Sequence, residues 1–225
     1  MRIAALVPVK HLDRAKKRLD GVLTPDQRRG LVIAMLKDVL AVLTGHPGLN
    51  AVHVVTPDET VAAIARQFGA RVIDEPPGGG LNAALRHAAE RLGGDGFEAL
   101  LQLPADVPNV GAGDIDRLLA AAVSAPSAVI VPAHDGDGTN GLLVSPPTTL
   151  PFAFGPGSCR RHQSLATAQG ATATALPLPG LAADIDKPAD LAKLQSMPRR
   201  GETGRFLDSI VLGATSLGEA ASPST

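Results

Sequence analysis

Positively charged side chains are concentrated directly after the first apolar run of the sequence. Between residues 10 and 18 the chain carries Lys10, Arg14, Lys16, Lys17 and Arg18. A triphosphate bound at the end of a strand needs such charge to offset its own, although a solvated basic loop is the alternative. The segment lacks the GxxxxGK[ST] of a phosphate loop, and no GxGxxG follows Val7. Side chains and a metal ion, more than a glycine cradle, are therefore expected to hold the phosphates.

Three aspartates follow apolar segments and have the chemistry of magnesium ligands. Asp106 lies in Leu103–Pro108, between two prolines, while Asp184 and Asp186 stand two residues apart before Lys187-Pro188. Residues i and i+2 of a strand face the same way, so this pair could join Asp106 around one Mg²⁺. Phosphates and waters would complete the coordination. The alternatives are an Asp turn for Asp106 and a helix N-cap for Asp186.

Two glycine-rich segments each precede a predicted helix. Glycines in 78–82 would let the backbone approach a ligand closely, and Asn82 suits a nucleobase edge or a ribose. In 154–158, Ser158 occupies the place of an N-cap, and a helix start is an anion site. A flexible turn with an Asn cap is the alternative for the first segment.

The segment 135–141, with the sequence DGDGTNG, has some likeness to a calcium loop. Its ligand spacing is too short and no glutamate occupies the twelfth position, so an EF-hand is excluded. Thr139 could reach a phosphate or carboxylate of a second substrate, and a polar hairpin loop is the alternative. Further along, Arg160 or Arg161 could add positive charge, whereas His162 is interpreted as helix surface or as a supporting residue.

The elements that must position these residues alternate between strand and helix patterns. Apolar runs predict strands at 3–7, 51–55, 71–73, 100–103 and 141–144, and helical spacing predicts helices at 25–43, 58–68, 81–92, 114–123, 159–169 and 188–194. This rhythm is typical of an α/β fold with a mostly parallel sheet covered by helices. Ligands of such sheets bind at the carboxyl ends of the strands. The loops expected at that edge follow Val9, Ile73, Leu103 and Val131.

Composition narrows the classes of function. The 225 residues suit one α/β domain, predicted at 1–197, with a partly disordered C-terminal tail at 198–225. Aromatic residues make up only 2%, which nearly excludes base stacking, and the net charge of -1 favours neither a nucleic-acid nor a membrane partner. Cys159 is the single cysteine, so no intramolecular disulfide forms, and no apolar run approaches the roughly 20 residues of a membrane span. We expect a cytoplasmic protein.

Seven short motifs occur in a fixed order along residues 1 to 195. They are Val7-Pro8-Val9-Lys10, Ala15-Lys16-Lys17-Arg18-Leu19, Gly80-Leu81-Asn82-Ala83-Ala84, Pro104-Ala105-Asp106-Val107-Pro108, Gly138-Thr139-Asn140, Phe154-Gly155-Pro156-Gly157-Ser158 with His162, and Asp184-Ile185-Asp186-Lys187-Pro188-Ala189-Asp190-Leu191. In this order they resemble the phospholactate guanylyltransferase family of coenzyme F-420 biosynthesis. Related members use phosphoenolpyruvate or 3-phospho-D-glycerate. Gly79 is a departure, since many relatives are expected to carry threonine there.

The resemblance implies a nucleotidyltransferase fold of the glycosyltransferase-A (nucleotide-diphospho-sugar transferase) type. It implies transfer of GMP from GTP to a small phosphorylated acid, with Mg²⁺ as cofactor and pyrophosphate as the second product. The implied metal ligands are Asp106, Asp184 and Asp186, and the implied acid site comprises Thr139, Gly155 and Ser158. The implied nucleotide site comprises Pro8, Lys10, Lys16, Arg18, Gly80 and Asn82. Asp106, Lys10 and Lys16 are the expected catalytic residues.

The expected reaction joins two anions. A phosphate oxygen of the acid would attack the α-phosphorus of GTP, and no general base is needed because the attacking phosphate is already ionised. Two alternatives remain: a sugar-nucleotide glycosyltransferase of the same fold, and a non-catalytic nucleotide-binding module that regulates a partner. The residues do not choose among phospholactate, phosphoenolpyruvate and 3-phospho-D-glycerate, and the preference for GTP rests on the resemblance alone. The oligomeric state stays open, and a homodimer is compatible with the sequence.

Overall fold

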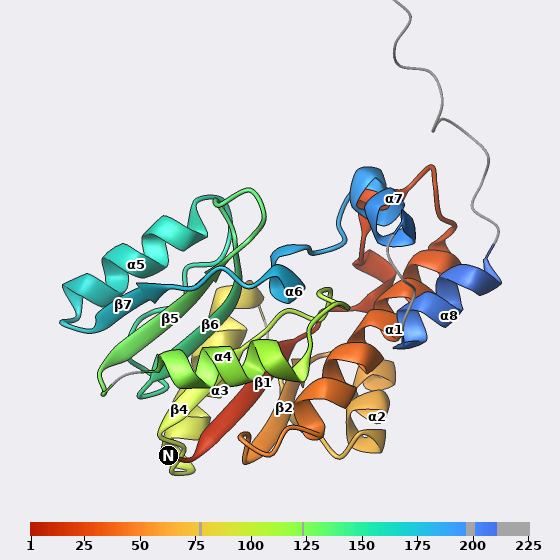
Figure 1. The fold of residues 1–225 in the computed structure, drawn as a ribbon. Helices are drawn as coiled ribbons and strands as arrows, with labels where there is room; N and C mark the ends of the chain where they lie inside the picture. Colours follow the sequence, from red (N-terminus) through yellow and green to blue (C-terminus); the bar gives the residue numbers. More distant parts are fainter. Residues whose placement is uncertain (77, 123, 197–200, 211–225) are drawn as a thin grey trace, which may run out of the picture.

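The computed structural model describes residues 1–76, 78–122, 124–196 and 201–210, which form a seven-stranded sheet with helices on both faces (Figure 1). The strands are β1 (Ile3–Pro8), β2 (Ala51–Thr56), β3 (Arg71–Asp74), β4 (Ala99–Gln102), β5 (Ser127–Pro132), β6 (Thr139–Ser145) and β7 (Thr172–Ala175). Their order across the sheet is β3-β2-β1-β4-β6-β5-β7. Only β6 runs antiparallel to its neighbours β4 and β5, whereas the other described pairs are parallel. The predicted α/β architecture with a mostly parallel sheet is therefore confirmed.

The strand β1 shows why the sheet is covered on both faces. Ala4 and Leu6 pack with the hydrophobic cluster on one face, and Ala5 and Val7 pack with the cluster on the other. All four side chains are fully buried. A strand that is apolar on both sides needs a helix layer on each, which is the usual arrangement of parallel sheets.

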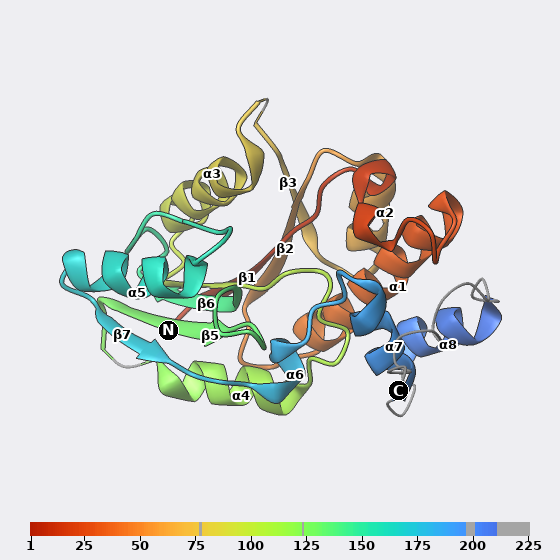
Figure 2. The same ribbon diagram turned by 90° about the horizontal axis from the view of Figure 1, so that it is seen from above.

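The helix layers divide between these two clusters. The face of Ala5 and Val7 carries α1 (Pro25–Thr44), α2 (Glu59–Gln67), α4 (Ala112–Ala121) and α6 (Pro179–Ala182). The face of Ala4 and Leu6 carries α3 (Gly80–Gly94) and α5 (Ser158–Ala168). Figure 2 shows α3 and α5 together on one side of the sheet and α4 on the other. In the described part of the chain, every helix is too short or too polar to cross a membrane.

The first residue of α1 is determined by the local sequence. The Thr24 hydroxyl accepts a hydrogen bond from the Gln27 amide at 3.2 Å, and the Gln27 side chain accepts one from the Thr24 amide at 2.8 Å. Pro25 occupies the first turn, where its missing N–H costs nothing. The predicted N-cap and helix are both confirmed.

Several elements are missing from the predicted strands and helices. Among them are α6, β5, the 3₁₀ turns η1 (Leu12–Arg14) and η2 (Lys17–Leu19) and the strand β7, which pairs in parallel with β5. Most side chains of β7 are exposed, and its sequence alternates threonine with alanine over only four residues. The hydrophobic signal on which strand prediction depends is therefore weak there.

The C-terminal part of the described chain contains α7 (Pro188–Ser196) and α8 (Gly201–Ser209), both beside α1 in Figure 1. The Asp38 carboxylate on α1 accepts hydrogen bonds from the amides of Glu202 and Thr203, at 2.7 and 2.9 Å. Leu207 joins the core that α1 covers. The predicted tail, 198–225, thus includes a helix that packs on the domain. The predicted boundary at 197–198 and most of the tail that was predicted to be partly disordered fall on residues outside the described ones.

Candidate active site

A cavity of about 910 Å³ opens at the edge of the sheet where the parallel strands end. The loops after β1, β3, β4 and β5 all contribute to its wall. Carboxyl ends of parallel strands meet at one edge, and ligand pockets of enzymes commonly measure about 300–1,000 Å³. The predicted convergence of these four loops is confirmed, and the cavity is large enough for a small-molecule substrate.

Nearly all predicted site residues line this cavity. They are Pro8, Lys10, Lys16, Arg18, Gly80, Asp106, Thr139, Gly155, Ser158, Asp184 and Asp186. Asn82 is the exception, because its amide is engaged elsewhere. Its nitrogen donates to the Phe154 carbonyl at 3.2 Å, and its oxygen accepts from the Phe154 amide at 2.9 Å. Asn82 thus ties α3 to the loop before α5, and its predicted contact with the nucleotide stays a prediction.

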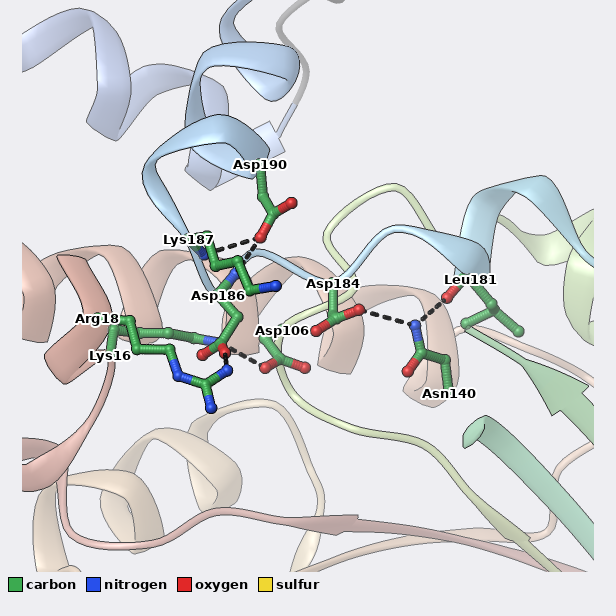
Figure 3. Close-up of polar contacts among 9 residues, drawn as sticks. All are labelled: Lys16, Arg18, Asp106, Asn140, Leu181, Asp184, Asp186, Lys187 and Asp190. Carbon is green, nitrogen blue, oxygen red and sulfur yellow. Dashed lines mark hydrogen bonds and ion pairs between the residues drawn. The ribbon is translucent and has the colours of Figure 1, made fainter. Parts of the chain in front are cut away.

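Lys16 lies at the centre of the charged part of the site. Its ammonium nitrogen is 2.5 Å from Asp106 Oδ2 and 3.7 Å from Asp186 Oδ1 (Figure 3). Burial lowers the pKa of Lys16, but the carboxylates of Asp106, Asp186 and Asp184 outweigh it, so the pKa lies above the usual 10.5. Lys16 is therefore a cation throughout the physiological range. We call Lys16, Arg18, Asp106, Asp184 and Asp186 the charged wall.

The backbone of Lys16 is also unusual. With φ 53° and ψ 38°, it is the one non-glycine residue with positive φ among those that the structure describes. That conformation costs roughly 1–2 kcal/mol in an ordinary residue. The flanking turns η1 and η2 bury Leu12 and Leu19, which fixes the chain on both sides. Strain of this kind persists where the surroundings enforce it, and here it directs a cation at the carboxylates.

Asp184 and Asp186 reach the cavity through an irregular segment, and the prediction that they share the face of a strand is wrong. Between them, Ile185 is buried, with 2% of its surface exposed. The amide of Ile185 donates to the backbone carbonyl of Asp106 at 3.2 Å. This hydrogen bond joins two segments that lie far apart in the sequence. The buried side chain anchors the segment, and the two carboxylates on either side line the cavity.

The alternative of Asp186 as a helix N-cap is answered by the bonds around Asp190. Its carboxylate accepts from the amides of Asp186 and Lys187, at 3.1 and 2.7 Å. The start of α7 is therefore satisfied by Asp190. The Asp186 carboxylate instead pairs with Arg18, at 2.6 Å, as Figure 3 shows.

The donor chemistry of the charged wall fits Mg²⁺. Within the described residues, no three His, Cys, Asp or Glu side chains stand close enough together to hold a metal ion. Mg²⁺ does not require such a cage, because it commonly uses one or two carboxylates with waters and substrate phosphates. The ammonium of Lys16, between Asp106 and Asp186, marks a place where positive charge is favoured. Magnesium binding at these aspartates stays a prediction.

A second part of the cavity wall is uncharged, and we call Thr139, Gly155 and Ser158 the neutral wall. Ser158 is the first residue of α5 and not its N-cap as predicted, because Gly157 takes that position with φ 70°. The Asp137 carboxylate accepts from the Gly157 amide at 2.7 Å, which joins the β5–β6 hairpin loop to the start of α5. The neutral wall is therefore held by hydrogen bonds between loops.

Two polar residues of the site were missed. Gln102, at the end of β4, lines the cavity and is 2% exposed, and its amide oxygen has no partner among the described residues. Asn140 donates to Asp184 Oδ1 at 3.2 Å and so positions one carboxylate of the charged wall. A polar residue ending an otherwise apolar strand was the available signal for Gln102. No local pattern pointed to the bond between Asn140 and Asp184.

Comparisons with known proteins agree on the class. A family model described as "Guanylyl transferase CofC like" matches residues 3–216, further than the motifs reached. A phosphoenolpyruvate guanylyltransferase of Rubrobacter xylanophilus is 44% identical over 196 residues, covering 87% of this chain and 95% of that protein. A 3-phospho-D-glycerate guanylyltransferase of Colwellia psychrerythraea is 35% identical over 194 residues, covering 86% and 91%.

The fold has relatives among solved structures. A candidate nucleotide-diphospho-sugar transferase from Desulfovibrio desulfuricans G20 superposes with a TM-score of 0.73 at 18% identity. The match covers 92% of this chain and 95% of that one. At this identity the likeness concerns the fold alone, which is the nucleotidyltransferase fold of the glycosyltransferase-A type expected from the sequence.

Proposed function

The chain belongs to the CofC-like guanylyl transferase family and is a nucleotidyltransferase, and from this we propose that it transfers GMP from GTP to a small phosphorylated acid. Phosphoenolpyruvate is the first candidate acid, because the relatives that are 36–44% identical carry that name. 3-Phospho-D-glycerate and 2-phospho-L-lactate are the other two. The resemblance further supports a place in coenzyme F-420 biosynthesis.

One observation carries this proposal: a single cavity combines a charged wall with a neutral wall. Lys16 and Arg18 supply positive charge beside three aspartates, and Lys10 lies at the same opening. Thr139 and Ser158 offer hydroxyl groups without a charge. The first arrangement suits a triphosphate with its cation, and the second suits the oxygens of a small acid.

The chemistry asks for positioning more than for proton transfer. A phosphate oxygen of the acid forms a bond to the α-phosphorus of GTP, and the bond from that phosphorus to the bridging oxygen of pyrophosphate breaks. The leaving pyrophosphate takes the electron pair, and no proton moves. Lys10, Lys16 and Arg18 offset the charge of both reactants, so that two anions can approach in line. Since Lys16 is cationic throughout the physiological range, its charge is present before the nucleotide arrives.

The neutral wall holds the acid in this scheme. Thr139, Ser158 and the backbone at Gly155 contact its phosphate and carboxylate oxygens. Asp106, Asp184 and Asp186 would hold Mg²⁺. When bound, this ion supplies neutralisation of phosphate charge and a fixed orientation of the phosphates.

A panel of three acids against four nucleotides tests the proposal. Pyrophosphate release is measured with Mg²⁺ present, and each product is identified by its mass. We expect release with GTP and phosphoenolpyruvate, and a product that contains GMP joined to the acid through a diphosphate. If none of the three acids supports pyrophosphate release, the proposal is overturned. Release of a nucleoside diphosphate from a sugar-nucleotide donor, without pyrophosphate release from GTP, would indicate the alternative of a glycosyltransferase.

A further inference from the structure

His162 on α5 is completely buried, yet both ring nitrogens have hydrogen-bond partners. Its Nε2 accepts from the backbone amide of Ala153 at 3.0 Å. Its Nδ1 lies 3.0 Å from the hydroxyl oxygen of Thr139. Thr139 lines the cavity, whereas His162 lies behind it and does not. The imidazole thus connects the loop before α5 to a hydroxyl of the neutral wall.

These two contacts determine which nitrogen carries the proton. A backbone amide can only donate, so Nε2 must present its lone pair to Ala153. A neutral imidazole has one N–H, which must then be on Nδ1. A cationic ring would place a second N–H against the Ala153 amide, with two donors facing each other. Burial, with the nearby Arg161 charge, lowers the pKa of His162 to about 4, in agreement with a neutral ring.

The tautomer in turn determines what Thr139 can do. With Nδ1–H as donor, the Thr139 hydroxyl is the acceptor in this bond. Its own proton is left to donate to a different group. In the described part of the chain, no acceptor for that proton is found, and the residue is 7% exposed at the cavity surface. The free donor therefore faces a ligand that brings an acceptor.

We propose that His162 is a positioning residue that fixes the Thr139 hydroxyl as a hydrogen-bond donor to an anionic oxygen of the phosphorylated acid. This inference rests on the proposed function and adds to it the polarity of one contact. A threonine hydroxyl alone both donates and accepts, and it rotates freely. With one of its two lone pairs engaged by His162, the hydroxyl is held in orientation and its proton is free for a ligand that brings an acceptor.

The surroundings of His162 are built to keep the ring in place. The Phe154 ring packs edge-on against it, with centroids 4.7 Å apart, and the Asn82 amide grips the Phe154 backbone. The Arg161 guanidinium donates to the Ala153 carbonyl through Nε at 3.2 Å and Nη2 at 2.8 Å. The Arg161 bonds hold the peptide group between Ala153 and Phe154, so Ala153 is fixed on both sides of its Cα.

The backbone of β6 also contributes. The pairing register of β5 and β6 shifts between Val131 and Pro132, opposite Gly141 and Thr139. Beyond this shift, Thr139 contacts α5 through His162, whereas its neighbour Asn140 contacts α6 and the segment that follows it. Such irregularities commonly re-aim side chains at the rim of a site.

The test is a double-mutant cycle on steady-state constants, using His162→Gln, Thr139→Val and the double variant. In His162→Gln the glutamine oxygen can still accept from Ala153, but the N–H of Nδ1 is gone. A hydrogen bond to an anion is worth about 10- to 100-fold in affinity. We expect KM for phosphoenolpyruvate to rise by about that factor in each single variant, with KM for GTP within about threefold of wild type. The double variant should be no worse than Thr139→Val, because His162 acts through the hydroxyl.

Two further variants separate positioning from mere support of the fold. His162→Asn places an amide N–H near the position of Nδ1 and should recover part of the affinity for the acid. Thr139→Ser, which keeps the hydroxyl, should resemble wild type. Thermal unfolding of every variant provides the control, because a smaller folded fraction lowers the apparent kcat and does not raise KM for one substrate alone.

The outcomes are distinct. Single-variant effects that multiply in the double variant, or equal changes in both KM values, overturn the inference about His162 while wild-type activity upholds the proposed function. Calorimetric titration of phosphoenolpyruvate into the wild type tests the proposed function itself. If the wild type neither binds a phosphorylated acid nor transfers GMP to one, the proposed function fails, and the inference fails with it.

Discussion

The two walls of the cavity hold their polar groups in opposite ways. In the charged wall, Lys16 and Arg18 are already paired with Asp106 and Asp186, so that positive and negative groups satisfy each other. In the neutral wall, the Thr139 hydroxyl is oriented by His162 and leaves one donor free. Ligand binding must therefore rearrange ion pairs on one side and complete a prepared contact on the other.

The comparison separates two routes to anion binding. Charged groups give large energies at long range, and they are sensitive to salt and to the loss of a partner. Uncharged donors give smaller energies, but their geometry is specific. In the charged wall we expect the loss of a shielded charged group to reduce turnover strongly and the loss of an exposed one to have a small effect that salt removes. In the neutral wall we expect selective changes in the affinity for one substrate.

The largest effect is expected for Asp106→Ala. The substitution removes a predicted metal ligand and leaves the Lys16 ammonium, with a side chain only 9% exposed, facing Asp186 alone at 3.7 Å. Loss of a preorganised charged group commonly costs about 10²–10³-fold in turnover, and loss of the ion as well should bring GMP transfer below detection. Steady-state pyrophosphate release measures it, with circular dichroism to verify the fold.

Asp13→Ala is the matched control. Asp13 lies in the basic loop that carries Lys16 and pairs with Arg29 at 3.0 Å, but its side chain is 81% exposed. It should retain nearly full activity. Turnover of Asp106→Ala close to that of wild type would remove the metal assignment, and an equal loss in Asp13→Ala would show that the loop tolerates no change of charge.

The pH dependence of stability should also distinguish the walls. The pKa of His162 is lowered to about 4, against about 6.5 in the unfolded chain, so the unfolded state binds the extra proton between these values. Stability from this group is complete above about pH 6.5 and is lost as the pH falls towards 4. From pH 6.5 to pH 4.5 we expect a loss of about 2 kcal/mol. Lys16 has the opposite sign: its raised pKa stabilises the fold below about pH 10.5, and this contribution is lost in more alkaline solution.

Urea unfolding at pH 4.5 and 6.5 measures this loss for wild type and His162→Gln. His53, whose pKa is also lowered to about 4, chiefly by burial, contributes a similar loss in both proteins. His162→Gln should therefore show about half of the wild-type change. If His162→Gln loses as much free energy of unfolding between pH 6.5 and pH 4.5 as the wild type does, His162 is not held neutral by its surroundings.

Local chemistry made part of this molecule predictable. The capping residues at Thr24 and Gln27 lie three apart, and Asp106 was conspicuous as a lone carboxylate between prolines at a strand end. These features depend on neighbours in the chain. The parallel order of strands then brought the correct loops together without any knowledge of distant contacts.

Contacts between distant segments made the rest unpredictable. Asn82 is the clearest example, since its partner Phe154 is 72 residues away and satisfies both groups of its amide. The hydrogen bond from Ile185 to Asp106 is of the same kind, as is the contact between His162 and Thr139. Residue types showed which side chains could bind ligands, but only the fold decided which had already been engaged.

Arg18→Gln should give the smallest effect and the clearest dependence on salt. Arg18 pairs with Asp186 at 2.6 Å, yet its side chain is 69% exposed, so its attraction for a nucleotide is screened by dissolved ions. We expect KM for GTP to rise by about three- to tenfold at 50 mM salt, with little difference from wild type at 500 mM. Arg205→Gln is the control, because Arg205 is 74% exposed and pairs with Glu202 at 2.7 Å on the remote helix α8. Steady-state kinetics of both variants at the two salt concentrations test this prediction. If the defect of Arg18→Gln persists at high salt, Arg18 makes a directional contact with the nucleotide. The charged wall would then bind by specific geometry, as the neutral wall does, and not by screened attraction alone.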